Sequence, residues 1–362
     1  MLMLVFTVFS PVRAQAQTSF DGSTDIFHLD DMRDGLSAEE QEIGGELTGT
    51  GPYDVGGAMR RLFDSLKKKT LEEVRGNLRF ASSLTGLTFL GGFACALCEE
   101  DKTRTLLEIC ICSAAASVLT GSMDSLIRQT MEAVYRLSDY SKAALPVVFT
   151  AAAASGAAAS AATRYAAVSL ALDVLMSTAQ RCILPLINAH LALTLACALF
   201  PNSMLKAFLR FVRWAAGILM AGTSLVFSAY IGMTGAVSTA VNTAAVKATK
   251  TLISTALPVV GGMISDVSGT VLAAAGIVRT CAGAFGLVSV CAVCLGPFVL
   301  LTAKVLLFKA VSVLAEAVPC GRLPALFSGV ADAAAMLMGL LGSCSIMLFL
   351  SFSLAMKAVT GV

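Results

Sequence analysis

The stretch Ala333–Met356, which reads AAAMLMGLLGSCSIMLFLSFSLAM, contains no charged residue and decides the class of the fold. An α-helix needs about 20 predominantly apolar residues to cross the hydrocarbon core of a bilayer, and this stretch is long enough. Its apolar residues are continuous rather than alternating, which favours a helix over a strand of a membrane barrel. We therefore predict a membrane-spanning helix here.

Three other uncharged stretches have the same character: Ala143–Thr163, Trp214–Val246 and Thr280–Ala303. Of the 362 residues, 56% are apolar and 14% are charged, whereas soluble globular proteins have about 45–50% and 25%. The predicted fold class is all-α, a polytopic helical membrane protein embedded in the lipid bilayer. The net charge of only +2 gives no indication of a nucleic-acid partner.

The N-terminal part is expected to divide into three segments. Residues 1–16 resemble a signal peptide, because an apolar stretch precedes Ala14-Gln15-Ala16. The usual basic start is missing, so a true start codon upstream is one expectation; a short uncleaved anchor is the alternative. Residues 17–57 are acidic and predicted to form a disordered polar arm. Residues 58–80 have the spacing of an amphipathic basic helix, either on the membrane surface or against a partner.

The remaining chain is predicted to hold a first membrane hairpin, residues 81–124, followed by two tandem repeats, residues 125–236 and 237–362. The motif ALPVV occurs at Ala144–Val148 and again at Ala256–Val260, and similar apolar segments follow both copies in the same order. Coincidence in an alanine-rich sequence is the alternative. Duplicated helical bundles are a common construction of membrane proteins with a central pathway.

Motifs of known catalytic sites are absent from the sequence. There is no phosphate-binding G-x-x-x-x-G-K-[ST], no G-x-S-x-G and no H-E-x-x-H, and the chain has only 2 histidines. The 11 cysteines lie mainly in apolar stretches, so the pairs Cys95/Cys98 and Cys291/Cys294 are interpreted as packing residues rather than as redox or zinc sites. We predict no catalytic residue, no metal and no cofactor.

Ionisable residues inside apolar stretches are the better candidates for a functional site, because a charge in lipid is costly and is usually retained for a reason. Glu108, Asp173, His190 and Lys304 are candidate intramembrane polar residues. A single histidine in an apolar helix is more often an interior residue than a ligand. Glu316 and Asp332 are interpreted as residues at helix ends in the interface.

A second candidate is the motif that begins at Pro258 and continues through Gly261, Gly262, Ser265 and Asp266. Proline followed by paired glycines weakens a helix and can break it within the membrane. Ser265 or Asp266 would then cap the second half-helix by accepting hydrogen bonds from its free N–H groups. The functional interpretation is a broken or re-entrant helix beside a water-lined path or a subunit contact. The alternative is a capped turn between two ordinary helices.

The stretch Ala256–Gly276, ALPVVGGMISDVSGTVLAAAG, resembles the stage III sporulation protein AE family of endospore-forming bacteria. The resemblance covers most of the chain after Arg60. It implies a non-enzymatic membrane subunit of the sporulation channel complex, located in the mother-cell membrane that surrounds the forespore. It also implies partners, namely the other membrane subunits of the sporulation channel operon and a forespore membrane partner.

Two functions therefore remain open at this point. The first is a structural or conduit subunit of a secretion-like complex that supports forespore development. The second is a stand-alone secondary transporter that uses intramembrane carboxylates, which the repeat and the Asp266 motif favour. A membrane-embedded enzyme is the weakest alternative, because no nucleophile or metal cluster is recognisable.

Overall fold

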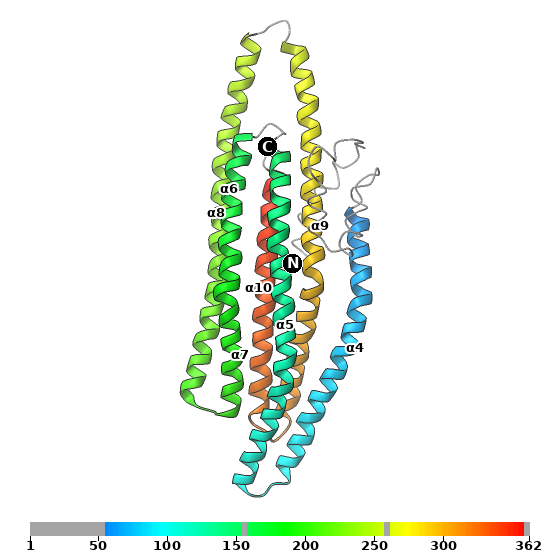
Figure 1. Cartoon of the computed structure of the whole chain (residues 1–362), viewed down its shortest axis with the longest axis vertical. Helices are drawn as coiled ribbons and strands as arrows, with labels where there is room; N and C mark the ends of the chain where they lie inside the picture. Colours follow the sequence, from blue (N-terminus) through cyan, green and yellow to red (C-terminus); the bar gives the residue numbers. More distant parts are fainter. Residues whose placement is uncertain (1–54, 154–157, 257–260, 358–362) are drawn as a thin grey trace.

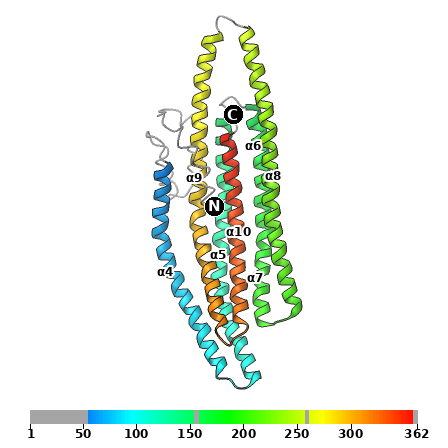
Figure 2. The ribbon, with the colours of Figure 1, turned by 180° about the vertical axis from the view of Figure 1, so that it is seen from behind.

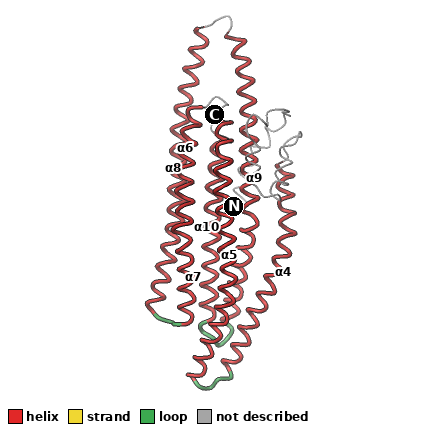
Figure 3. The backbone as a smooth tube through the Cα atoms, in the orientation of Figure 1, coloured by secondary structure: helices red, strands yellow, loops and turns green. Residues whose placement is uncertain are grey.

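The computed structural model of the protein describes residues 55–153, 158–256 and 261–357, and in these residues every regular element is a helix (Figure 3). This confirms the predicted all-α class. The predicted signal peptide and nearly all of the polar arm lie outside the described residues. The elements are α4 (Val55–Ala96), α5 (Asp101–Ala152), α6 (Ala158–Thr178), the π-helical turn η4 (Ala179–Ile183), α7 (Leu184–Leu199), α8 (Ser203–Ala256), α9 (Gly261–Glu316) and α10 (Leu323–Lys357).

The helices form an elongated up-and-down bundle in which successive long helices run antiparallel (Figure 1). Helix α10 contacts α5, α7, α8 and α9 and is therefore at the centre of the packing. Figures 1 and 2 show α5 and α10 on opposite broad sides of the bundle, between α9 on one flank and the α6–α8 group on the other. The loops that follow α4, α7 and α9 all lie at the same end, which we call the loop end.

Five helices among the described residues are long and apolar enough to cross a membrane, which confirms the polytopic membrane class. They are Asp101–Ala152, Ala161–Leu199, Ser203–Tyr230, Gly286–Glu316 and Leu323–Ser353. Helix α4 is not one of the five. Helix α5 has 52 residues, which is about 78 Å of helix and more than twice the hydrocarbon thickness of a bilayer. The bundle therefore extends beyond any single bilayer core.

Several predicted segment boundaries lie inside continuous helices. Helix α4 runs without interruption through the boundary at residues 80/81, α5 through 124/125 and α8 through 236/237. A helix passes such a boundary because a change from apolar to polar side chains on one face does not disturb the backbone hydrogen bonds. Whether the two halves of the chain are related as repeats stays a prediction.

Glycines allow the closest helix contacts in the bundle. A Cβ added at Gly92 in α4 would collide with Val318 in the α9–α10 loop, and one at Gly329 in α10 would collide with Thr194 of α7. A Cβ at Gly286 in α9 would lie 2.6 Å from the ring of Phe352. Such close approach of backbones is the usual role of small residues in membrane bundles.

Cys95 pairs with a partner far along the chain rather than with Cys98. The sulfur of Cys95 lies 3.1 Å from that of Cys320, which is 225 residues away in the α9–α10 loop. Both side chains are 1% exposed, whereas Cys98 is only half-buried. Burial raises the pKa of the Cys320 thiol to about 12. The contact fixes the end of α4 against the loop.

This contact predicts unequal thiol reactivity. At pH 8 we expect iodoacetamide to alkylate Cys98 at least about ten-fold faster than Cys320, because the thiolate is the reactive form and burial suppresses both ionisation and access. Site-resolved mass spectrometry of the folded protein in mild detergent measures both rates. The difference should vanish in denaturant, and equal rates in the folded protein would contradict the packing of α4 on the loop.

Candidate functional site

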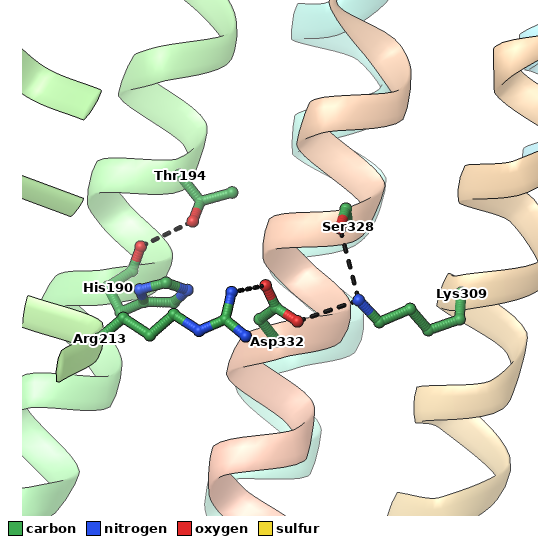
Figure 4. A network of polar contacts seen from close by, with 6 residues as sticks. All are labelled: His190, Thr194, Arg213, Lys309, Ser328 and Asp332. Atoms are coloured by element: carbon green, nitrogen blue, oxygen red, sulfur yellow. Dashed lines mark hydrogen bonds and ion pairs between the residues drawn. The ribbon is translucent and has the colours of Figure 1, made fainter. Parts of the chain in front are cut away.

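A network of ion pairs centred on Asp332 joins three helices near the loop end (Figure 4). Asp332 lies in α10, Arg213 in α8 and Lys309 in α9. Each carboxylate oxygen accepts from a different helix: the Arg213 guanidinium donates to Oδ2 at 2.5 Å, and the Lys309 ammonium donates to Oδ1 at 3.0 Å. The Lys309 ammonium also donates to the Ser328 hydroxyl at 3.4 Å. We call Arg213, Lys309, Ser328 and Asp332 the Asp332 network.

The Asp332 network is buried at its centre and open at its ends. The Asp332 side chain is 15% exposed, whereas those of Arg213 and Lys309 are 58% and 48% exposed. One carboxylate therefore holds two cations whose aliphatic stems approach it from the two flanks of α10. Because α8 and α9 lie on opposite flanks, the network ties the two sides of the bundle together across α10.

His190 lies next to this network, on α7 (Figure 4). Its side chain is 1% exposed, and neither ring nitrogen has a hydrogen-bond partner among the described residues. Its backbone carbonyl accepts a hydrogen bond from the Thr194 hydroxyl at 2.9 Å. His190 thus lies in the interior of the bundle, while a functional role for it stays a prediction. The interpretation of Asp332 as a helix-end residue did not include its two ion pairs, because Arg213 and Lys309 come from other helices.

Glu108 belongs to a second set of ion pairs, closer to the loops. Its two carboxylate oxygens lie 3.8 Å from Arg104 and 3.4 Å from Arg322. Arg322 donates to the backbone carbonyl of Leu199, and Arg104 donates to that of Pro319. Glu108 thus joins α5 to the loop before α10 and to the end of α7. These ion pairs and hydrogen bonds stabilise the packing of the helices against one another.

The other predicted polar residues are dispersed. Lys304 lies on α9, with its ammonium 4.4 Å from the ring centre of Phe80 and 3.4 Å from the Ser122 hydroxyl. Asp173 is exposed on α6, between the exposed side chains of Leu170 and Val174. The structure brings neither residue into the Asp332 network.

The motif around Asp266 lies at the end of the bundle opposite the loop end (Figure 1). Gly261 is the first residue of α9, and Gly262, Ser265 and Asp266 follow within its first two turns. Pro258 lies outside the described residues. Helices α8 and α9 are separate elements on the two sides of this motif, while a role in a pathway or a subunit contact stays a prediction.

The outward face of α5 is polar along most of the helix. Its exposed residues include Ser113, Ser117, Asp124, Ser125, Arg128, Gln129, Glu132, Arg136, Asp139 and Lys142. We call this set the α5 polar face. Residues between them, such as Leu119, Leu126 and Leu137, are at most 1% exposed and face the core. Helix α5 is therefore amphipathic although it contains a segment apolar enough to span a membrane.

Two contacts fix the height of the α5 polar face in the bundle. Ser122 is level with Lys304 of α9, through their 3.4 Å contact. Tyr140 is level with Phe352 of α10, since their ring centres are 6.2 Å apart, and Phe352 in turn contacts Gly286 of α9. The charged part of α5 thus lies beside residues 286–304 of α9.

At the same height α9 and α10 have no charge. Residues 286–303 of α9 belong to the uncharged stretch Thr280–Ala303, and α10 is uncharged from Ala333 to Met356. Helix α8 is uncharged from Trp214 to Val246, and most of its exposed side chains up to Tyr230 are apolar, among them Trp214, Ile218 and Leu225. One side of the bundle is thus suited to lipid, whereas the side formed by α5 is not.

Comparison with known proteins identifies the family of the chain. No curated protein and no solved structure matches the chain. The family model described as stage III sporulation protein AE matches residues 50–359. The match includes every helix described above, from α4 to α10. The chain therefore belongs to the stage III sporulation protein AE family.

Proposed function

We propose that the protein is a non-enzymatic integral membrane subunit of a channel complex between the mother cell and the forespore, needed for forespore development. The observation that carries the proposal is the α5 polar face at the height of the uncharged stretches. A protein alone in a bilayer would expose these charges to lipid, at a cost of about 2.5–3.5 kcal/mol for each central charge. In an assembly, water or another subunit covers the face instead.

The ion pairs within the bundle support a structural rather than a catalytic role. Asp332 binds two cations from other helices, and Glu108 pairs with Arg104 of its own helix and with Arg322 of the α9–α10 loop. Such carboxylates stabilise the helix arrangement, and both oxygens of Asp332 already accept from guanidinium and ammonium donors. Membership in the sporulation family agrees with a role of this kind.

The proposed location is the mother-cell membrane surrounding the forespore. The proposed partners are the other membrane subunits of the sporulation channel operon and a forespore membrane protein. Five candidate spans support an integral subunit. An energy-supplying partner fits a chain whose sequence has no nucleotide-binding motif of its own.

Affinity purification from sporulating cells after engulfment tests the proposal. The tagged full-length protein is extracted in mild detergent, and the co-purified proteins are identified by mass spectrometry. We expect the other operon products and a forespore membrane protein to be recovered in stoichiometric amounts. Recovery as a monomer or a small homo-oligomer would overturn the proposal. An unrelated polytopic membrane protein with the same tag is the control for detergent carry-over.

A stand-alone secondary transporter is the second candidate, and the buried, unpartnered His190 beside Asp332 is the observation that favours it. A transporter coupled to ions through an intramembrane carboxylate would lose transport in Asp266→Asn while it still assembles. A structural subunit would tolerate Asp266→Asn or fail to assemble, so transport measured beside co-purification of the partners separates the two functions.

A further inference from the structure

We infer that the α5 polar face borders a water-filled passage at the height of the membrane, rather than packing against a partner helix or lipid. The inference rests on the proposed function, since a single chain cannot keep lipid away from this face. It goes further by naming water as the medium that contacts α5.

Four of the six charges of the face are paired along their own helix. The Arg128 guanidinium donates to Asp124 Oδ2 from two nitrogens, at 3.1 and 2.6 Å, and Arg136 donates to Glu132 at 3.1 Å. The Asp124 and Arg128 side chains are 56% and 76% exposed, those of Glu132 and Arg136 65% and 49%. Burying such pairs under a partner would remove their hydration without supplying new counter-charges, which is unfavourable.

The side chains of the face are also of the wrong size for helix packing in a membrane. Helix contacts there use glycine, alanine and serine, because small residues allow close approach. Gly92 and Gly329 do this inside the bundle. By contrast, the α5 polar face from Asp124 to Lys142 carries long charged and amide side chains at most exposed positions. These side chains are suited to contact with water.

Helix α8 provides the opposite case on the other flank of α10, where Met220 lies next to Gly339. Its Trp214 is 61% exposed and its Leu225 is 72% exposed, and it is uncharged from Trp214 to Val246. Apolar side chains at this height are stable against lipid, and tryptophan favours the boundary between the acyl chains and the headgroups. The bundle is thus two-sided, with α8 suited to lipid and α5 suited to water.

The sign of the charges indicates what this lining would admit. Asp124, Glu132 and Asp139 alternate along the helix with Arg128, Arg136 and Lys142. Three acidic and three basic groups give the face no net charge. A ring of like charges selects ions by sign, whereas an alternating set has no strong preference. The lining on α5 is therefore expected to discriminate by size rather than by charge.

Thiol accessibility in native membranes tests the inference. Cysteine is introduced singly at Ser125 or Gln129 on α5, and at Gly217 or Leu225 on α8 as matched controls at the same height. The exposed native Cys110 and Cys182 are replaced by alanine in the background. A membrane-impermeant, positively charged methanethiosulfonate is applied to membranes from engulfed cells, opened so that it reaches both faces, and labelling is measured at each site by mass spectrometry.

We expect the α5 positions to react at least ten-fold faster than the α8 positions, because the reagent and the thiolate both require water. Equally slow labelling at both sets of positions in membranes and in detergent would overturn the inference. So would slow α5 labelling that becomes fast only when the complex is dispersed, because that result places a partner protein on the face. Each helix is tested at two positions, so the comparison still holds if one variant fails to fold.

A failure of this inference can be distinguished from a failure of the proposed function. If the protein co-purifies with its partners but α5 stays unreactive in membranes, the channel-subunit proposal stands and the water-filled passage fails. If the protein is recovered alone, the channel-subunit proposal fails whatever the labelling, and the inference that rests on it fails too.

Discussion

Asp332→Asn is expected to lower the free energy of unfolding by about 1–2 kcal/mol, which is a large fraction of the marginal stability of a domain. The amide keeps the shape of the side chain but leaves Arg213 and Lys309 without their common anion. Breaking a fully buried ion pair costs about 3–5 kcal/mol. The smaller value applies here because both cations are about half exposed and water screens them.

Thermal unfolding in detergent measures this loss, and Asp124→Asn is the matched control. Asp124 also pairs with an arginine, at 2.6 Å, but the pair is exposed and lies within one helix. Its loss should change stability by less than about 0.5 kcal/mol. If the two variants were equally stable, the Asp332 network would not hold α8 and α9 to α10.

Gly92→Ala is expected to destabilise the protein by about 2 kcal/mol, the usual range for overpacking a close contact. The added methyl group would collide with Val318, whose β-branched side chain has little freedom to rotate away. The end of α4 must then move from the α9–α10 loop, and the Cys95–Cys320 contact opens with it. Alkylation of Cys320 should accelerate in this variant.

Gly121→Ala is the control for the glycine prediction. Gly121 is also helical, in α5, but a Cβ there would have nothing within 4 Å. Alanine favours a helix over glycine by about 1 kcal/mol, so the control should be equal to or more stable than the original protein. Destabilisation of both variants by the same amount would contradict a specific contact between α4 and the loop.

The membrane class and the helical content could be predicted from the sequence because both depend on local features. Ala333–Met356 is long, uncharged and continuous, and any chain with such a stretch satisfies its backbone in lipid by forming a helix. The buried position of His190 follows in the same way from its apolar surroundings. The segment boundaries were less predictable, since a helix such as α5 continues when only one of its faces changes polarity.

The partners of the charged residues could not be predicted, because they join residues far apart in the chain. Arg213 and Asp332 are 119 residues apart, and Cys95 and Cys320 are 225 apart. The sequence signal was the charged residue that borders each uncharged stretch, such as Arg213 before Trp214 and Asp332 before Ala333. That signal marks a membrane boundary but names no partner.

The sequence by itself therefore determined which solvent the chain requires and which secondary structure that solvent permits. The spacing of Asp124, Arg128, Glu132 and Arg136 also predicts a polar helix face, through pairs four residues apart. Only the tertiary structure decided that this face lies at the height of uncharged α9 and α10. The height depends on how the helices slide along one another, which is fixed by contacts such as Tyr140 with Phe352 and by no local pattern.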